Sequence, residues 1–106
     1  MEDILEELRY KHRKGRRRDQ ELTVFSLSTC GFCKRALAFL SDNGFAYRFV
    51  QLDKIPPEAK RRVKDELHTR FNTSPVFPVL VVDGKRAVTG FTEDQWRKLL
   101  KLPEAG

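Results

Sequence analysis

The sequence predicts an α/β fold with the element order strand, helix, strand, helix, strand, strand, helix and a four-stranded mixed sheet. Three observations support this prediction. Apolar, β-rich segments alternate with segments of helical periodicity, an Asp-Gly pair joins the last two strands, and two cysteines lie where the first strand gives way to a helix. With 106 residues and 40% hydrophobic content, the chain is long enough for one core and too short for two.

The first half of this fold is predicted from residues 22–71. Residues 22–27 are β-rich and mostly apolar, as in a buried central strand, and residues 34–43 form a helix that stops at Asn43-Gly44. Residues 45–52 resume strand character, and Ile55-Pro56-Pro57 ends that strand. A longer helix follows, because apolar residues recur at every fourth position: Ala59, Val63, Leu67 and Phe71.

The second half contains a hairpin and a last helix. Residues 77–82 are a third apolar strand that begins around Pro78. Asp83-Gly84 predicts a two-residue turn into a fourth strand, residues 85–89, because this pair readily adopts positive φ angles. Thr92 is predicted to cap the final helix, whose inward residues are Trp96, Leu99 and Leu100.

Residues 1–21 are predicted to be an N-terminal helix and a basic arm, added to a domain of residues 22–106. Ile4, Leu5 and Leu8 lie at helical spacing, which predicts a short helix within residues 3–12. Residues 9–18 carry seven Lys or Arg and no acid, within a net charge of +6. Clustered cations attract polyanions, but no nucleic-acid-binding motif accompanies them, so we expect a solvated arm and no nucleic-acid partner. A nucleic-acid adaptor that uses Arg16, Arg17 and Arg18 is the alternative.

Neither a membrane span nor a secretory signal is predicted. The longest apolar runs, such as residues 76–82, are far shorter than the roughly 20 residues of a spanning helix, and the N-terminus opens with acidic residues. We therefore expect a cytoplasmic protein with no membrane partner. Two cysteines are also too few for the disulfide framework of a secreted mini-protein, which leaves redox chemistry or metal binding.

Cys30 and Cys33 form a Cys-Gly-Phe-Cys motif between the first predicted strand and the first helix, which is a typical setting for redox-active cysteines. The unpaired amides and the dipole of a helix N-terminus stabilise a thiolate, and Cys30 lies at that end. Cys33 lies one turn into the helix, where its sulfur can turn toward Cys30. The motif predicts thiol–disulfide exchange, with Cys30 as the attacking thiolate and Cys33 as the resolving thiol.

The alternative for this pair is half of a zinc or iron–sulfur site, since two cysteines at this spacing also make one edge of a tetrahedral site. No third cysteine is present, and only His12 and His68 could contribute a histidine ligand. We expect no resident metal. A dimer that shares an iron–sulfur cluster stays open as an alternative.

Pro78 is a second candidate for the site. A proline that starts an apolar strand is unfavourable unless its missing N–H is harmless or its peptide bond is cis. A cis bond would expose the N–H and C=O of Phe77 to an extended substrate held across Cys30. A proline at the start of an edge strand fits the pattern equally well, and Pro75, in a predicted turn, is the competing candidate.

Three segments together resemble the glutaredoxin family: Ser-Thr-Cys-Gly-Phe-Cys at residues 28–33, Phe-Pro-Val at 77–79 and Thr-Gly-Phe at 89–91. The resemblance spans roughly residues 22–102 and implies a thioredoxin-like fold. In that family the first cysteine is the nucleophile, the proline is cis beside it, and the Gly-containing turn holds one end of a glutathione. The resemblance implies catalytic Cys30 and Cys33, and it implies substrate binding by Phe32, Phe77, Pro78, Gly90 and Phe91.

Two positions depart from the family pattern. Leu27 stands three residues before Cys30, where glutathione-using members usually carry a Lys that binds the glutathione carboxylate. The Gly31-Phe32 pair is similar to that of the cluster-carrying members, whose motif ends in Ser. We expect an oxidoreductase that reduces protein or small-molecule disulfides, is not strongly glutathione-dependent and needs no bound cofactor. Its external reductant would be glutathione or a thioredoxin-reductase-type enzyme. A glutathione-dependent glutaredoxin and a dimeric cluster carrier are the alternatives.

Overall fold

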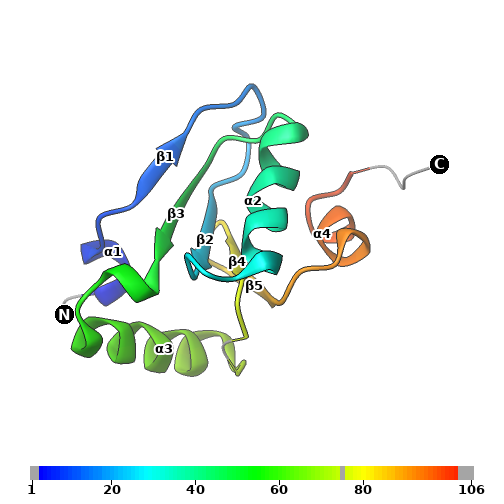
Figure 1. The fold of residues 1–106 in the computed structure, drawn as a ribbon. Coiled ribbons are helices and arrows are strands. Elements are labelled where there is room, and N and C mark those ends of the chain that lie inside the picture. The colour runs from blue at the N-terminus through cyan, green and yellow to red at the C-terminus, as the bar shows by residue number, and fades with distance from the viewer. Residues whose placement is uncertain (1–2, 75, 103–106) are drawn as a thin grey trace.

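The computed structural model describes residues 3–74 and 76–102, which form a mixed β-sheet between two layers of helices (Figure 1). The strands are β1 (Lys11–Arg13), β2 (Leu22–Ser26), β3 (Tyr47–Gln51), β4 (Val79–Val82) and β5 (Arg86–Thr89). The helices are α1 (Ile4–Glu7), α2 (Gly31–Asp42), α3 (Pro57–Phe71) and α4 (Glu93–Leu99), with a 3-10 turn η1 (Leu52–Lys54). None of these helices is long and apolar enough to cross a membrane.

The strands lie in the order β1-β3-β2-β4-β5. β2 and β3 are parallel, and the other neighbouring pairs are antiparallel. Successive side chains of a strand point to opposite faces, so the sheet divides the apolar residues into two clusters. The cluster under α2 and α4 includes Leu22, Val24, Leu80, Val82 and Trp96. The cluster under α1 and α3 includes Phe25, Val50, Val63, Leu67 and Val79.

The predicted hairpin and the cap of the last helix are both present. Asp83 and Gly84 adopt φ angles of 55° and 67°, and the backbone N–H of Lys85 donates a hydrogen bond of 3.0 Å to the C=O of Val82. The connection is one residue longer than the two-residue turn expected, because Val82 pairs with Arg86 and Lys85 lies outside β5. The Thr92 side chain accepts a hydrogen bond of 3.2 Å from the backbone N–H of Gln95. Trp96 is fully buried, as its position in the helical pattern predicts.

The N-terminal segment differs from the prediction. The sheet has five strands, not the four expected, because Lys11–Arg13 pairs antiparallel with β3. The helix expected within residues 3–12 ends at Glu7. Further along, Arg17 and the chain at residues 44–46 exchange two backbone hydrogen bonds of 2.9 Å each. A strand edge carries unpaired backbone groups, and the arm satisfies those of β3. The arm is therefore part of the sheet and not a purely solvated appendage.

The sheet brings several chain segments together at one of its two ends, the edge at which the strands β2, β3 and β5 stop. The parallel strands β2 and β3 both end there, and antiparallel β4 begins there. β5 pairs antiparallel with β4 and so also ends at this edge. The segments that follow β2, β3 and β5, and the one that precedes β4, therefore meet at one place. These segments hold most of the residues that the sequence singles out.

Candidate active site

Cys30 caps the N-terminus of α2. Its backbone is extended, and its Sγ accepts a hydrogen bond of 3.2 Å from the backbone N–H of Cys33. The backbone C=O of Cys30 accepts the first helical hydrogen bond, from Lys34 at 3.1 Å. Both cysteines are free thiols, and Cys30 is partly exposed. An orphan amide of the helix N-terminus therefore points at the sulfur of Cys30, as the sequence predicts.

Cys33 has a different environment from Cys30. Its side chain is buried, with 1% of its surface exposed, on the side of α2 that faces the sheet. Two effects raise the pKa of the Cys33 thiol to about 12. Burial is the larger of them, and the hydrogen bond to Cys30 is the second. The two thiols are thus adjacent but unequal, since one is accessible at a helix terminus and the other is held protonated in the interior.

Asp53 supports the loop before Cys30 and was not predicted as a site residue. Its carboxylate accepts a hydrogen bond of 2.8 Å from the backbone N–H of Ser28 and a second bond from the Ser28 hydroxyl. These bonds hold the pKa of the Asp53 carboxyl below its usual value. The available signal was its place just after the strand parallel to β2, because neighbouring parallel strands end at the same edge.

The Phe77–Pro78 peptide bond is cis. Val79 pairs with Phe25, so Phe77 and Pro78 continue alongside the end of β2 that leads to Cys30. The predicted cis bond is therefore present at Pro78; Pro75, the competing candidate, lies outside the described residues. The backbone N–H of Gly90 lies within hydrogen-bond distance of the C=O of Pro78, at 2.8 Å, and of Val76, at 3.0 Å, which joins the two predicted binding segments.

Two of the three aromatic candidates, Phe32 and Phe91, differ in their surroundings. Phe32 is 58% exposed beside Cys30, and the Arg35 guanidinium lies 5.4 Å from its ring centroid. Phe91 instead packs into the core, with its ring centroid 5.0 Å from that of Trp96 and 5.7 Å from that of Phe39. The partly buried Phe91 ring is thus engaged with Phe39 and Trp96, whereas Phe32 presents its side chain to solvent.

Leu27 packs against the apolar cluster under α1 and α3. Of the cations that could replace the missing Lys, Lys34 is exposed in the first turn of α2 and Arg35 lies over Phe32. Lys85 lies in the β4–β5 turn, at the opposite edge of the sheet. Lys64 of α3, which the sequence analysis missed, has its ammonium 6.0 Å from the centroid of the Phe77 ring.

No group of three or more His, Cys, Asp or Glu side chains that could hold a metal occurs in residues 3–74 and 76–102. His12 lies in the exposed strand β1. His68 is exposed on α3, where its Nδ1 lies 3.1 Å from the C=O of Thr73. The two histidines considered as partners of the cysteines are thus on separate elements, each away from α2.

A sequence model of the glutaredoxin family matches residues 22–87. Among solved structures, the chain is similar to a glutaredoxin from Methanosarcina mazei Go1, with 29% identity, a TM-score of 0.75 and coverage of 87% of each chain. It is also similar to methanoredoxin from Methanosarcina acetivorans, with 31% identity, a TM-score of 0.72 and coverage of 81% of this chain and 88% of that one. No curated protein sequence matches significantly.

A third similar structure is a glutaredoxin from Archaeoglobus fulgidus, with 31% identity, a TM-score of 0.67 and coverage of 78% of this chain and 88% of that one. The matched family region holds well over half of the chain and includes both cysteines, Asp53 and the cis proline. The chain therefore belongs to the glutaredoxin family and has its thioredoxin-like fold.

Proposed function

We propose that the chain is a thiol–disulfide oxidoreductase that reduces disulfides through Cys30 and Cys33. The Cys30 thiolate attacks one sulfur of a substrate disulfide, which forms a mixed disulfide and releases one substrate thiolate. Cys33 then loses its proton and attacks the Cys30 sulfur, which closes the Cys30–Cys33 disulfide and releases the second substrate thiolate. An external reductant supplies the two electrons and two protons that restore the dithiol.

The observation that carries this proposal is the inequality of the two thiols. The Cys30 sulfur is partly exposed and accepts a hydrogen bond from a helix-terminal N–H. Cys33 is buried and its pKa is raised, which keeps it from competing with Cys30 for substrate. Because Cys33 is buried, its thiol can attack only the mixed disulfide that Cys30 has formed with the substrate. The order of attack and resolution follows from these two environments.

Substrate binding is proposed at the sheet edge beside Cys30. Phe32 offers an exposed apolar face, and Val76, which is 59% exposed, offers another next to Phe77 and Pro78. An extended substrate could pair with the Phe77 backbone, with the turn at Gly90 and Phe91 at its end. Disulfide-containing proteins fit such a site, because the backbone contacts need only an extended chain. A reducing compartment such as the cytoplasm would keep the dithiol ready.

We infer that glutathione is not the preferred reductant. A glutathione site needs a cation beside the attacking sulfur, and position 27 instead holds a partly buried Leu that packs against the core. Arg35 is stacked on Phe32 and Lys85 is at the far edge. Lys34, Lys54 and Lys64 lie on segments around the site, and none of them takes the place of residue 27 in the sequence. A thioredoxin-reductase-type enzyme would not require this cation, because it recognises its partner through a protein–protein surface and not through the carboxylates of glutathione.

The test is a comparison of two reducing systems. NADPH oxidation is coupled to reduction of a small disulfide, first through glutathione and glutathione reductase and then through thioredoxin reductase alone. The proposal expects turnover in at least one system and faster turnover with thioredoxin reductase. Absence of turnover in both would refute the oxidoreductase assignment, and faster turnover with glutathione would refute the choice of reductant. Iron analysis and the visible spectrum of freshly purified protein test the cluster carrier separately.

A further inference from the structure

A groove of about 760 Å³ lies between the N-terminal segment, β3, η1 and the start of α3. Apolar residues line it, including Ile4, Leu8, Ile55 and Ala59. Its volume is within the range of about 300–1,000 Å³ that is usual for ligand sites. Two sides of the groove come from α1 and β1, which precede the region that the family model matches. The groove therefore depends on the N-terminal addition.

Four cations surround this apolar lining: Arg9, Lys11, Lys54 and Arg62. All four are exposed, and Glu7 is the single acid among the lining residues. In the described part of the chain, none of the four side chains makes an ion pair, since those ion pairs involve Arg48, Arg70 and Arg97. An apolar groove with unpaired positive charges at its rim is complementary to a ligand that has apolar and acidic groups together.

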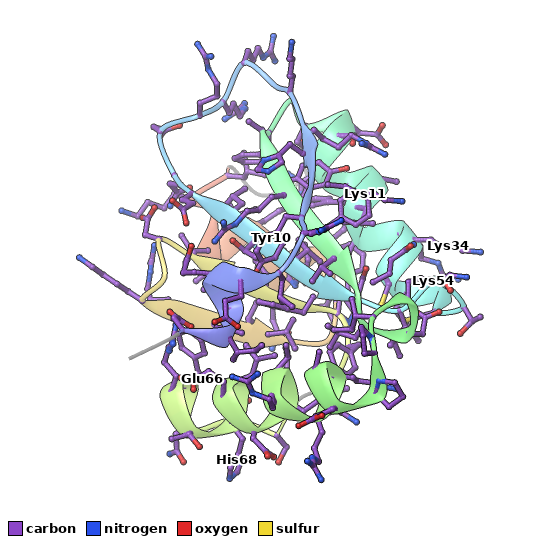
Figure 2. All side chains as sticks on the ribbon, turned by 90° about the vertical axis from the view of Figure 1, so that its left-hand side faces the viewer. Tyr10, Lys11, Lys34, Lys54, Glu66 and His68 are labelled. Carbon is purple, nitrogen blue, oxygen red and sulfur yellow. The ribbon has the colours of Figure 1, made fainter. Side chains whose placement is uncertain are left out.

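Part of the groove lining, Gln51 and Lys54, lies at the end of β3, beside the end of β2 that leads to Cys30. β1 runs antiparallel to β3, so Arg9 and Lys11, at its start, lie toward the edge where β3 ends. Lys54 directly follows Asp53, whose carboxylate holds Ser28, two residues before Cys30. Viewed from the side of α1 and β1, Lys11, Lys34 and Lys54 lie on the same flank of the molecule (Figure 2).

We propose that this groove binds an acidic, apolar-anchored segment of a protein substrate while the substrate disulfide lies at Cys30. The inference rests on the proposed function and specifies its substrate class. A peptide segment fits better than a nucleic acid, because the aromatic side chain of the groove, Phe49, is buried and offers no face for base stacking. The arginine run at residues 16–18 also lies past the other end of β1.

The first test measures binding with cysteine-free peptides, so that it does not depend on thiol reactivity. The probe is a fluorescein-labelled peptide with the sequence Gly-Asp-Glu-Leu-Phe-Glu-Asp-Gly. Two matched peptides replace either its acids by the corresponding amides or its Leu and Phe by Ala. We expect the probe to bind more tightly than both matched peptides, and its Kd to rise with salt, because both charge and apolar contact contribute.

The variant is Lys11→Glu combined with Arg62→Glu, and the matched control is Lys85→Glu combined with Lys98→Glu, which makes the same change in net charge at exposed positions outside the groove. We expect the groove variant to raise Kd roughly tenfold, since each exposed ion pair contributes a factor of a few and reversal adds repulsion. The control should change Kd less than about threefold. Circular dichroism checks that both variants keep the fold.

Equal losses in the groove variant and the control would overturn the proposal, because net charge alone would then explain binding. Equal affinity for the Ala-substituted peptide, or tighter binding of an oligothymidylate than of the probe, would also overturn it.

The second test compares reduction of disulfide peptides with acidic and neutral flanks. The acidic-to-neutral ratio of kcat/KM should exceed one and fall toward one in the groove variant. Binding without any reduction would refute the proposed function alone.

Discussion

The carboxylate of Asp53 accepts two hydrogen bonds from Ser28, one from the backbone N–H at 2.8 Å and one from the side-chain hydroxyl. This pair joins the end of β3 to the loop that carries Cys30, across two strands that are parallel neighbours. The bonds to Ser28 lower the pKa of Asp53, so the carboxylate is the form that supports the loop.

Asp53→Ala should lower kcat/KM for disulfide reduction roughly three- to tenfold, because the loop before Cys30 loses its support. Asp53→Asn is the matched control, since its amide oxygen can still accept the Ser28 N–H, and it should retain most of the activity. The lowered pKa means that the bond's contribution to stability is present above the unfolded pKa and lost as pH falls through the native one. The unfolding midpoints of wild type and Asp53→Ala should therefore converge as the pH falls below about 4. A difference between the midpoints that stays the same at every pH would contradict the role of the Asp53 carboxylate.

The buried Cys33 thiol should make the stability of the protein depend on pH in the alkaline range. Burial raises its pKa from 9.0 to about 12, so between these values the unfolded chain has lost a proton that the reduced native protein keeps. Stability should therefore fall as pH rises through this window, and Cys33→Ser should make the fall shallower. Urea denaturation of both proteins in excess reductant measures the difference. Parallel curves would show that the Cys33 thiol is not held protonated in the native state.

Leu27→Lys should raise glutathione-driven turnover about ten- to a hundredfold, because a charged hydrogen bond to a carboxylate contributes roughly 1.5–3 kcal/mol. The thioredoxin-reductase route should change much less. Leu27→Met controls for the loss of packing, since Met has a similar volume and no charge. A Lys variant that behaves like the Met variant in both assays would show that residue 27 only packs against the core.

Gly15→Ala should destabilise the protein by about 1–3 kcal/mol, as overpacking at a rigid contact does. A Cβ at position 15 would lie 2.4 Å from the backbone carbon of Phe45 and 2.5 Å from its oxygen. Gly31→Ala is the control, since a Cβ there meets nothing within 4 Å. Thermal denaturation should separate the two variants. Equal midpoints would mean that the arm does not hold its place against residues 45–46.

The element order could be predicted because it depends on local patterns. Apolar periodicity indicated β2, α2, β3 and α3, Asp83-Gly84 indicated the hairpin, and Thr92 indicated the last cap. The strand β1 could not be predicted in this way, since Lys-His-Arg is exposed along its whole length and has no apolar alternation. It is a strand because it pairs with β3, which is a long-range event.

The site residues show the same difference between local and long-range signals. The cysteine spacing and the proline-led strand are local, so Cys30, Cys33 and Pro78 could be identified directly. Asp53 meets Ser28 across 25 positions, and Lys64 reaches Phe77 from another element. The groove needs the N-terminal segment, β3, η1 and α3 together. Partnerships of this kind follow from which strands become neighbours and where the helices pack, and local periodicity does not specify either.

The most direct test of the account is to trap the intermediate that the unequal thiols predict. Cys33→Ser and Cys30→Ser are each reduced, incubated with a disulfide peptide and analysed by mass spectrometry with peptide mapping. Cys33→Ser should accumulate a mixed disulfide at Cys30, because attack proceeds and resolution is lost. Cys30→Ser should remain unmodified, because its remaining thiol is buried and protonated. An adduct at Cys33 in Cys30→Ser, formed as fast as the adduct at Cys30 in Cys33→Ser, would contradict the assignment of the two roles.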